Sequence, residues 1–511
     1  MAAAWLKDAV FYEIYPQSFL DTNGDGIGDF KGIEEKLDYI LSLGCNALWI
    51  NPCYDSPFKD AGYDVRDYKK TAARYGTNED LYRLFEKAHE KGIHVLLDLV
   101  PGHTSEEHAW FRESQKDEAN EFSDRYIWTD FCFRGASGLP YIGGESERSG
   151  AYVLNFFKCQ PALNYGFLNP TENWQLSWRD PRCIATREAL KDIIRFWLSK
   201  GCDGFRVDMA ASLVKLDDEK KSGTSAIWRD VRRMLDAEFP EAVMVSEWSN
   251  PKLALRAGYD MDFCLNEPGS GYGTLMRDYD NGEDHSYFKK DAGGSINRFL
   301  DQYLDWYEDT KDLGYISLIT CNHDTRRPAL NLDETELGLA YAFIFTMPGV
   351  PFLYYGDEIG MRWLDLPTKE GGYYRTGSRT PMQWTSGKNL GFSTADAKDL
   401  YLPVDSAPDA PTVEAQEKDP ASLLNTVRAL LKLRHAHKDL QSDAPLKILC
   451  CEPGRPFIYQ RGDMVLALNT TGSSLKAALP QAQKELVFSL GTGSWEEGQL
   501  EVGPQSFVVF A

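Results

Sequence analysis

The chain has 511 residues, of which 43% are hydrophobic and 13% aromatic, and its formal net charge is -22. A single hydrophobic core seldom serves a chain this long, so we expect a large main domain and one or two smaller ones. The negative charge argues against nucleic acid or a membrane as a partner, because phosphate groups would be repelled and no basic run compensates. The sequence contains ten cysteines without a metal-type CxxC pair, and no segment of the length of a signal peptide or a membrane span. We therefore expect a cytoplasmic protein whose cysteines are free thiols.

Strand-like and helix-like runs alternate from the N-terminus onward. A predicted strand at 10–15 precedes a helix at 33–43, a strand at 46–50, a helix at 79–91 and a strand at 94–100. The pattern continues with strands near 204–208, 242–246, 261–265, 315–320 and 350–355 and with helices near 187–200, 225–239 and 334–345. Such alternation is typical of βαβ units and a parallel sheet, and eight strands predict an α/β fold of the TIM (β/α)8 barrel type.

The alternation fails between His103 and Pro181, over a distance too long for a simple loop in a compact domain. We predict a small subdomain inserted after the third strand. Behind an amphipathic helix at 422–440, short alternating strands indicate a C-terminal antiparallel β-sandwich domain. The predicted boundaries are 1–102 and 181–442 for the barrel, 103–180 for the inserted subdomain and 443–511 for the C-terminal domain.

Three carboxylates follow buried, β-branched runs that read as barrel strands. Asp208 ends GFRVD, Glu247 follows AVMVS, and Asp324 comes shortly after YISLIT. Because parallel barrel strands end at the same face, we expect these three side chains to converge in one pocket. A group of carboxylates in one pocket points to glycosidase chemistry, in which one ionised carboxylate attacks the sugar and one protonated carboxyl donates to the leaving oxygen.

With these motifs in this order, the chain resembles the α-amylase superfamily, glycoside hydrolase family 13, and is most similar to its oligo-1,6-glucosidase and α-glucosidase branch. The resemblance extends from VFYEIYPQSF near the N-terminus to RTPMQW at 379–384 and on through the C-terminal β domain. It implies that Asp208 is the nucleophile, Glu247 the general acid and base, and Asp324 the carboxylate that holds sugar hydroxyls and helps to distort the ring. A retaining enzyme of this kind needs its two reacting carboxyl groups about 5 to 5.5 Å apart.

The neighbours of these acids predict their charge states. Arg206 should keep Asp208 ionised, since an adjacent guanidinium lowers a carboxyl pKa. Glu247 should hold its proton near neutral pH, because the negative charges of Asp208 and Asp324 disfavour a third negative charge beside them.

The resemblance also implies sugar-binding residues. His103 in DLVPGHTS and His323 in CNHDT match two histidines that hydrogen-bond the sugar at the cleavage site. Tyr63 in DAGYDV matches an aromatic platform that stacks on the apolar face of the sugar. Asp98 is interpreted as a residue that orders the site and not as a catalyst.

Asp60 and Arg379 match a pair that, in exo-acting relatives, meets across the pocket floor and grips the non-reducing end of the substrate. Such a pair closes the pocket to long polymers and predicts exo action on short α-glucosides. The alternative is an ion pair that only ties two loops together.

The segment 21–29 has oxygen-bearing side chains at alternate positions and glycines where the chain must turn, as in an EF-hand loop. We predict a structural Ca²⁺ ion there, with Mg²⁺ or a metal-free turn as alternatives, because Gly32 stands where an EF-hand has its glutamate. The predicted ligands are the side chains of Asp21, Asn23, Asp25 and Asp29 and the carbonyl of Ile27. No organic cofactor is expected.

Three positions depart from the family pattern. Gly102 replaces an asparagine that serves a second calcium in larger amylases, so we predict no calcium at the interface of the inserted subdomain. Ala162 in QPALN replaces an aspartate and weakens the usual anchoring of that subdomain. Met209, next to the nucleophile, matches neither the residue of α-1,6 enzymes nor that of α-1,4 enzymes, and linkage preference stays open.

The resemblance thus predicts a retaining, exo-acting α-glucosidase that releases terminal glucose from short oligosaccharides by double displacement. The alternative is a glucosyl-transferring or isomerising enzyme of the trehalose synthase or sucrose isomerase type, which a pocket that excludes water would favour. Non-catalytic, transporter-associated relatives lose the acids that this chain keeps. We expect a small oligosaccharide or disaccharide as the partner, and a monomer or homodimer.

Overall fold

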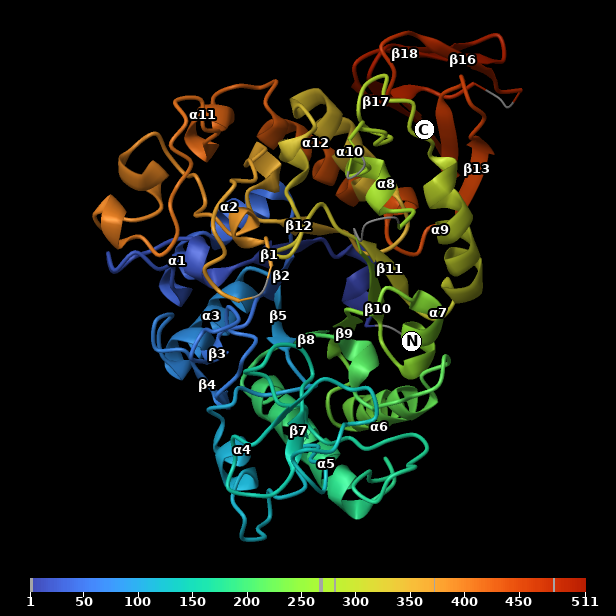
Figure 1. Ribbon diagram of the computed structural model, residues 1–511. Helices are drawn as coiled ribbons and strands as arrows, with labels where there is room; N and C mark the ends of the chain where they lie inside the picture. Colours follow the sequence, from blue (N-terminus) through green and yellow to red (C-terminus); the bar gives the residue numbers. More distant parts are fainter. Residues whose placement is uncertain (1–2, 266–269, 280–281, 372, 481–482) are drawn as a thin grey trace.

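The computed structural model describes residues 3–265, 270–279, 282–371, 373–480 and 483–511. Eight parallel strands form its central sheet, in the order β11-β10-β9-β8-β5-β2-β1-β12, and a parallel bridge between Ile319 and Phe352 connects the two edges. The strands are β1 Phe11–Ile14, β2 Ala47–Ile50, β5 His94–Leu99, β8 Gly204–Val207, β9 Val243–Ser246, β10 Met261–Cys264, β11 Tyr315–Leu318 and β12 Phe352–Tyr354. Figure 1 shows them arranged around a common centre, which confirms the predicted barrel.

The barrel strands are buried at nearly every position, as expected for strands with helices outside and packed side chains inside. Aromatic rings from three separate strands meet in the barrel interior. The ring of Phe263 lies 5.3 Å from that of Trp49 and 4.8 Å from that of Phe352. The interior is therefore a packed core below the face where the strands end.

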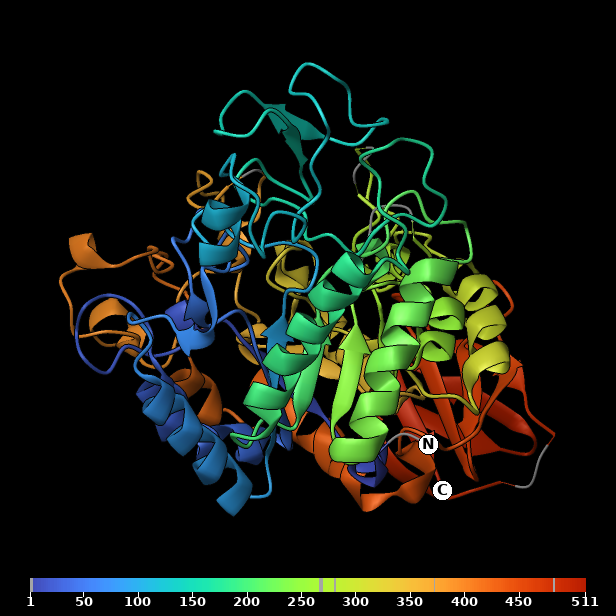
Figure 2. The same ribbon diagram turned by 90° about the horizontal axis from the view of Figure 1, so that it is seen from below.

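Helices cover the outside of the barrel, and Figure 2 shows α5 and α6 side by side along it. The covering helices include α1 Phe30–Glu35, α2 Leu37–Leu43, α3 Asn78–Glu90, α5 Pro181–Leu198, α6 Ser222–Glu238, α7 Pro251–Ala254, α8 Gly273–Met276, α9 Asn297–Thr310 and α10 Glu334–Thr346. Capping boxes begin α3 at Thr77 and α10 at Asp333, where each side chain accepts a backbone N–H of the first turn. Helix α10 is buried along almost its whole length, because α12, Leu423–Ala436, packs on its outer side.

The segment between β5 and α5 contains α4 Ala109–Ser114, β6 Tyr141–Gly143 and β7 Ala151–Val153. It has a small apolar cluster of its own, made of Ile127, Ala136, Val153, Ala162 and Phe167. Figure 2 shows it above the face where the barrel strands end. A backbone bridge between His103 and Ala162 pairs the start of this segment with its later part, so main-chain pairing holds the position where the family aspartate is missing.

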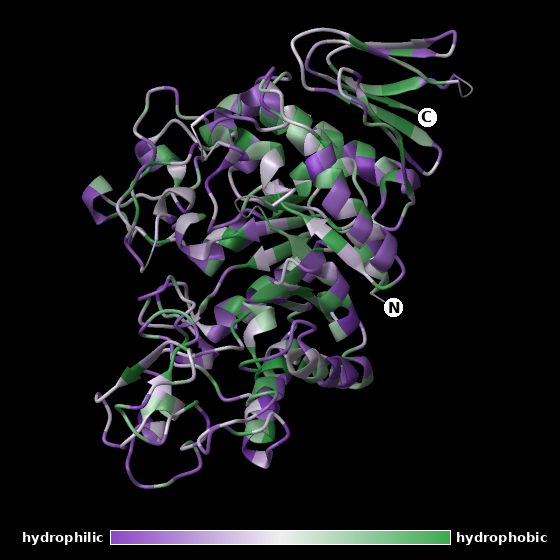
Figure 3. Cartoon of the chain, turned by 45° about the vertical axis from the view of Figure 1, so that its right-hand side comes forward, coloured by the Kyte–Doolittle hydropathy of each residue, from purple (hydrophilic) through white to green (hydrophobic). Residues whose placement is uncertain are grey.

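The C-terminal region forms two antiparallel sheets, which confirms the predicted β-sandwich. One contains β13 Leu446–Cys450, β14 Phe457–Arg461, β15 Met464–Asn469, β17 Leu486–Leu490 and β20 Ser506–Phe510, and the other β16 Leu475–Ala478, β18 Gly493–Glu496 and β19 Gln499–Val502. Ile458, Val465, Trp495, Leu500 and Val508 are buried in one cluster between them. In Figure 3 the strands beside the C-terminus are largely hydrophobic, whereas the smaller sheet and the outer helices mix hydrophobic and hydrophilic residues. Among the described helices, none combines the length and the apolarity that a membrane crossing requires.

Candidate active site

A cavity of about 330 Å³ lies at the carboxyl ends of the barrel strands. The three predicted catalytic acids, Asp208, Glu247 and Asp324, all line it. Three of the predicted sugar-binding residues do so as well: Asp60, Tyr63 and His103. A volume of this size is at the lower end of small-molecule sites, and the face is the one where barrel enzymes bind their substrates.

Asp208 and Glu247 lie against the same guanidinium. Arg206, on β8, is 1% exposed; its Nη1 lies 3.2 Å from Asp208 Oδ1 and its Nη2 lies 2.8 Å from Glu247 Oε1. The other Glu247 oxygen accepts a hydrogen bond of 2.9 Å from the backbone N–H of Met209. One buried cation therefore holds both predicted reacting carboxylates beside one position in the cavity.

The charge state of Asp208 differs from the sequence prediction. Burial raises the pKa of Asp208 well above its ordinary value, repulsion from Glu247 adds to the rise, and Arg206 opposes it. Because Arg206 also lies 2.8 Å from Asp98, one positive charge is shared among three carboxylates. Arg206 does lower the pKa of Asp208, as predicted, but burial and Glu247 outweigh it, so the prediction that Arg206 keeps Asp208 ionised is wrong for the free site. Neighbouring carboxylates that repel each other favour one shared proton, which supplies one acid and one base.

Asp324 has the opposite environment. Its Oδ1 lies 2.6 Å from Arg379 Nη2 and 3.0 Å from Arg375 Nη1. Burial works against ionisation, but the neighbouring His323, Arg375 and Arg379 together lower the pKa of Asp324 below its ordinary value. Asp324 is therefore an ionised carboxylate that can accept hydrogen bonds from sugar hydroxyls.

Asp60 pairs with Arg375 and not with Arg379, so the predicted partner is wrong. A single 3₁₀ turn, Thr376–Ser378, separates the two arginines; Arg375 lines the cavity, whereas Arg379 lies behind Asp324. Arg379 instead binds Asp324 and donates from Nε to the carbonyl of His323 at 2.8 Å. In the sequence, Arg375 could have been found as a second arginine one turn before the motif RTPMQW.

The two predicted histidines occupy different places. His103 lines the cavity and donates from Nε2 to the carbonyl oxygen of Tyr63 at 3.1 Å. Burial lowers the pKa of His103 to about 3, so the ring is neutral. His323 is 0% exposed, and it is absent from the described residues that line the cavity. Its ring stacks on that of Tyr63, with centroids 5.4 Å apart, and its Nε2 lies 3.4 Å from Asp324 Oδ2. His323 thus contacts the cavity wall from behind.

Asp98 lies under the cavity, as a residue that orders the site would. Its carboxylate contacts Arg206 at 2.8 Å, Trp49 Nε1 at 3.1 Å and the Tyr63 hydroxyl at 3.1 Å. Two aromatic residues at the cavity mouth were missed in the sequence, Phe156 with 43% and Tyr373 with 41% exposure. Both lie in irregular segments, where no periodic pattern marks a functional aromatic.

The predicted calcium loop folds on its own backbone. Asp21 accepts hydrogen bonds from Gly24 N at 2.7 Å and Gly26 N at 2.8 Å, and Asp29 caps α1 by accepting from Gly32 N at 2.8 Å. Gly24 and Gly26 have φ angles of 82° and 87°, which residues with a side chain rarely adopt. The donor atoms are all oxygen, the type that Ca²⁺ prefers. Over the described residues no group of three or more His, Cys, Asp or Glu forms a metal site, so the metal stays a prediction.

A cation of the chain itself lies at the interface of the inserted subdomain. Lys215 Nζ lies 2.6 Å from Asn155 Oδ1 and 2.8 Å from the Ser212 carbonyl, and burial lowers its pKa to about 8. A Cβ atom at Gly102 would come within 2.7 Å of Asn155 Nδ2. A second cation there would face the ammonium group, which supports the prediction made from Gly102.

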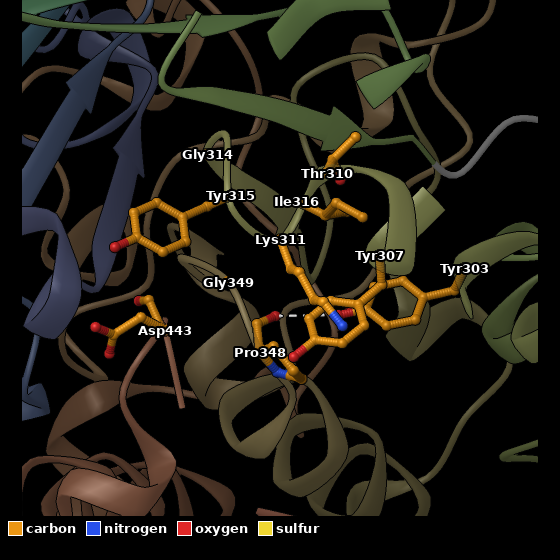
Figure 4. A pocket seen from close by; sticks show the side chains of 11 residues that line it. Tyr303, Tyr307, Thr310, Lys311, Gly314, Tyr315, Ile316, Pro348, Gly349 and Asp443 are labelled. Atoms are coloured by element: carbon orange, nitrogen blue, oxygen red, sulfur yellow. Dashed lines mark hydrogen bonds between the residues drawn. The ribbon is translucent and has the colours of Figure 1, made fainter. Parts of the chain in front are cut away.

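A smaller cavity of about 20 Å³ lies between α9, β11 and the segment before β12 (Figure 4). Lys311, Tyr315 and Asp443 line it, and the Tyr303 hydroxyl donates to the Pro348 carbonyl at 3.4 Å. Such a volume holds one water molecule and no sugar. The cavity of about 330 Å³ is the candidate active site because the three carboxylates line it.

A barrel with buried carboxylates gathered at its strand ends defines an enzyme that acts on glycosidic bonds. The family model "Alpha amylase, catalytic domain" matches residues 13–443. The chain belongs to this α-amylase family, glycoside hydrolase family 13, whose members hydrolyse or transfer glycosyl groups.

Two curated relatives show the range of activities among similar sequences. The chain is 32% identical to the trehalose synthase/amylase TreS of Mycobacterium tuberculosis (strain CDC 1551 / Oshkosh), over 91% of this chain and 82% of that protein. It is 31% identical to an oligo-1,6-glucosidase of Heyndrickxia coagulans, over 96% of both.

Solved structures similar to this chain include a trehalulose synthase and an isomaltulose synthase. A trehalulose synthase in complex with Tris has a TM-score of 0.82 and 26% identity, over 99% of this chain and 100% of that one. An isomaltulose synthase from Erwinia rhapontici NX5, in complex with its natural substrate sucrose, has a TM-score of 0.82 and 26% identity, over 99% of both chains.

Proposed function

We propose that the protein is a retaining, exo-acting α-glucosidase that hydrolyses the terminal α-linked glucose of short oligosaccharides. The observation that carries the proposal is the position of Asp208 and Glu247 on the two terminal nitrogens of Arg206. This arrangement supports a pair of carboxyl groups that act on one anomeric carbon with one proton between them.

In the first step, a carboxylate oxygen of Asp208 bonds to the anomeric carbon while the glycosidic bond breaks. Glu247 gives its proton to the leaving oxygen. In the second step, Glu247 takes a proton from water, the water oxygen bonds to the anomeric carbon, and the bond to Asp208 breaks. Two inversions leave the glucose as the α-anomer.

The charged end of the cavity supports exo action. Asp60 binds Arg375 and accepts from Gln160 Nε2 at 2.6 Å, and Asp324 binds both Arg375 and Arg379. Ionised groups fixed in this way can hold the hydroxyls of one terminal glucose. We expect the same network to stop a polymer from continuing through that end.

The test is product analysis with maltose, isomaltose, trehalose, sucrose and maltotriose. We expect free glucose as the main product. The anomer is followed by proton NMR with sucrose or an aryl α-glucoside, because their leaving groups are not glucose; we expect α-glucose first and β-glucose only later, through mutarotation. β-Glucose that appears before α-glucose would overturn the retaining mechanism, and oligosaccharides released from the interior of longer chains would overturn exo action.

A second candidate is a glucosyl-transferring or isomerising enzyme, as the names of the relatives suggest. Phe156 and Tyr373 place two half-exposed aromatic rings at the cavity mouth, where they can keep a released sugar in the site. The sugar would then attack the glucosyl group in place of water. Trehalose formed from maltose, or a sucrose isomer formed from sucrose, in excess of free glucose would favour this candidate.

We also propose that the loop 21–29 binds Ca²⁺ through Asp21, Asn23, Asp25, Asp29 and the Ile27 carbonyl. The all-oxygen donor set and the two left-handed glycines support it. EDTA should lower the melting temperature by a few degrees, and Ca²⁺ should restore it more fully than Mg²⁺. An unchanged melting temperature, together with no metal in elemental analysis, would assign the loop as a metal-free turn.

We propose a cytoplasmic location for the enzyme. Apart from Cys264, the cysteines are free thiols in the structure, and disulfides form mainly in oxidising compartments. Cell fractionation tests this directly, because recovery in the secreted or periplasmic fraction would contradict it.

A further inference from the structure

A buried glutamate lies behind the active site. Glu13, on β1, is 0% exposed, and its Oε1 lies 2.8 Å from Nδ1 of His323. Its other oxygen, Oε2, is buried without a hydrogen-bond partner among the described residues. No lysine or arginine of the described chain forms an ion pair with it. A carboxylate in this position would have no directly bound cation, and burial outweighs the more distant Arg206, so the environment favours the protonated form.

The neighbours on the Nδ1 side of His323 show which atom carries the hydrogen. The side-chain nitrogen of Asn51 lies 3.1 Å from His323 Nδ1 and 3.1 Å from Glu13 Oε1. An amide N–H pointing at Nδ1 requires Nδ1 to be an acceptor. If the amide were turned over, its oxygen would face Glu13, and a proton on Glu13 would again be needed between two acceptors.

The Nε2 side of the ring requires the opposite polarity. The hydroxyl of Tyr63 lies 2.6 Å from His323 Nε2, donates to Asp98 at 3.1 Å and accepts from Arg206 at 3.3 Å. A hydroxyl has one hydrogen and two lone pairs, so the lone pair that remains can only accept from His323. The ionised Asp324, 3.4 Å from Nε2, is also an acceptor. Nε2 must therefore carry the proton of the ring.

We propose that Glu13 is a positioning residue of this site, whose protonated carboxyl donates to Nδ1 of His323 and fixes the ring with its proton on Nε2. His323 then holds Tyr63 and Asp324, which line the cavity, in their working orientation. Burial raises the pKa of Glu13 well above its ordinary value, which keeps the proton in place at neutral pH. As far as it concerns turnover, the proposal rests on the proposed glycosidase function.

The packing around the ring explains why a hydrogen bond is needed as well. The rings of Tyr15 and Tyr63 stack against that of His323 at centroid distances of 6.2 Å and 5.4 Å, and Trp49 meets its edge at 5.8 Å. These ring contacts confine the plane of the His323 ring but do not distinguish its two nitrogens. Glu13 supplies that distinction, and its loss should affect kcat more than KM, because Asp324 acts on the distorted sugar.

Two variants separate hydrogen bonding from mere space filling. In Glu13→Gln, an amide N–H can replace the carboxyl hydrogen, so we expect kcat/KM for an aryl α-glucoside within about threefold of the wild type. Glu13→Met has the same length without a donor, and we expect kcat/KM to fall about 10- to 100-fold, mainly through kcat. The matched control is Glu358→Met, which removes a buried carboxyl bonded to Tyr12 and Tyr39 and should leave kcat/KM of the folded protein unchanged.

The tautomer of His323 can be measured without any substrate. Long-range proton–nitrogen NMR spectra of protein with 15N-histidine report which ring nitrogen is protonated, and loss of a signal in His323→Gln assigns it. We expect the Nε2–H form in the wild type and in Glu13→Gln. The Nδ1–H form in the wild type, or wild-type kcat/KM in folded Glu13→Met, would overturn the proposal. If no α-glucoside is turned over, the proposed function fails, and the NMR result still decides the role of Glu13. If Glu13→Met does not fold, the tautomer in the wild type and in Glu13→Gln decides it.

Discussion

The two sides of the cavity hold the same functional group in opposite charge environments. On one side, the single guanidinium of Arg206 forms ion pairs with Asp98, Asp208 and Glu247. Asp324, in contrast, contacts two arginines at once, although Arg375 also binds Asp60 and Arg379 also lies 3.6 Å from Glu370. The pKa of Asp208 is raised, chiefly by burial, whereas that of Asp324 is lowered by its charged neighbours against the effect of burial. The ratio of cations to carboxylates thus decides the direction of the shift.

This difference matches two kinds of chemical work. A reacting pair has to exchange a proton with the substrate, so a site with too few cations, where the proton is retained, is suited to it. A binding carboxylate needs a fixed charge and a fixed direction, which two guanidinium groups provide. The following variants change the ratio on one side at a time.

Asp208→Asn should have the largest effect. Loss of the nucleophile should lower kcat for an aryl α-glucoside by about 10³-fold or more. The same change removes repulsion with Glu247, so the melting temperature should rise. Steady-state kinetics and thermal melting measure both quantities on one sample. Turnover like that of the wild type would end the assignment of Asp208, and a lower melting temperature would contradict the shortage of cations on this side.

Arg375→Gln changes the binding side. The variant leaves Asp324 with one arginine and Asp60 with none, and we expect kcat/KM to fall about 10- to 100-fold. Arg326→Gln is the control, because that side chain is exposed on the neighbouring segment and should change kcat/KM less than about twofold. Equal kinetics for the two variants would show that Arg375 only ties loops together.

The sequence was sufficient for the barrel and for the convergence of the acids. Continuous apolar runs identified all eight barrel strands, and a carboxylate after such a run must lie at the common face. Helix α9 was not predicted, although Phe299, Leu300 and Tyr303 recur at helical spacing and are buried. This omission left the barrel topology unaffected.

Charge sharing could not be predicted from spacing along the chain. Asp98 and Arg206 are register partners on β5 and β8, so the contact between Asp98 and the guanidinium depends on how the two strands pair. In the same way, the choice between Arg375 and Arg379 as the partner of Asp60 depends on how one 3₁₀ turn is oriented. Such differences of one residue or one turn need coordinates.

The smallest expected effect is the pH dependence of the stability that His103 contributes on the binding side. Burial, aided by the charge of Lys215, lowers its pKa to about 3, compared with about 6.5 in the unfolded chain. Between these values the unfolded chain binds more protons, so the contribution to stability is complete above about pH 6.5 and is lost as the pH falls. The free energy of unfolding of the wild type, minus that of His103→Gln, should therefore shrink by about 2 kcal/mol from pH 6.5 to pH 4.5. Denaturant titrations of both proteins at the two pH values measure it, and a difference that does not change with pH would mean that His103 is charged or exposed in the folded protein.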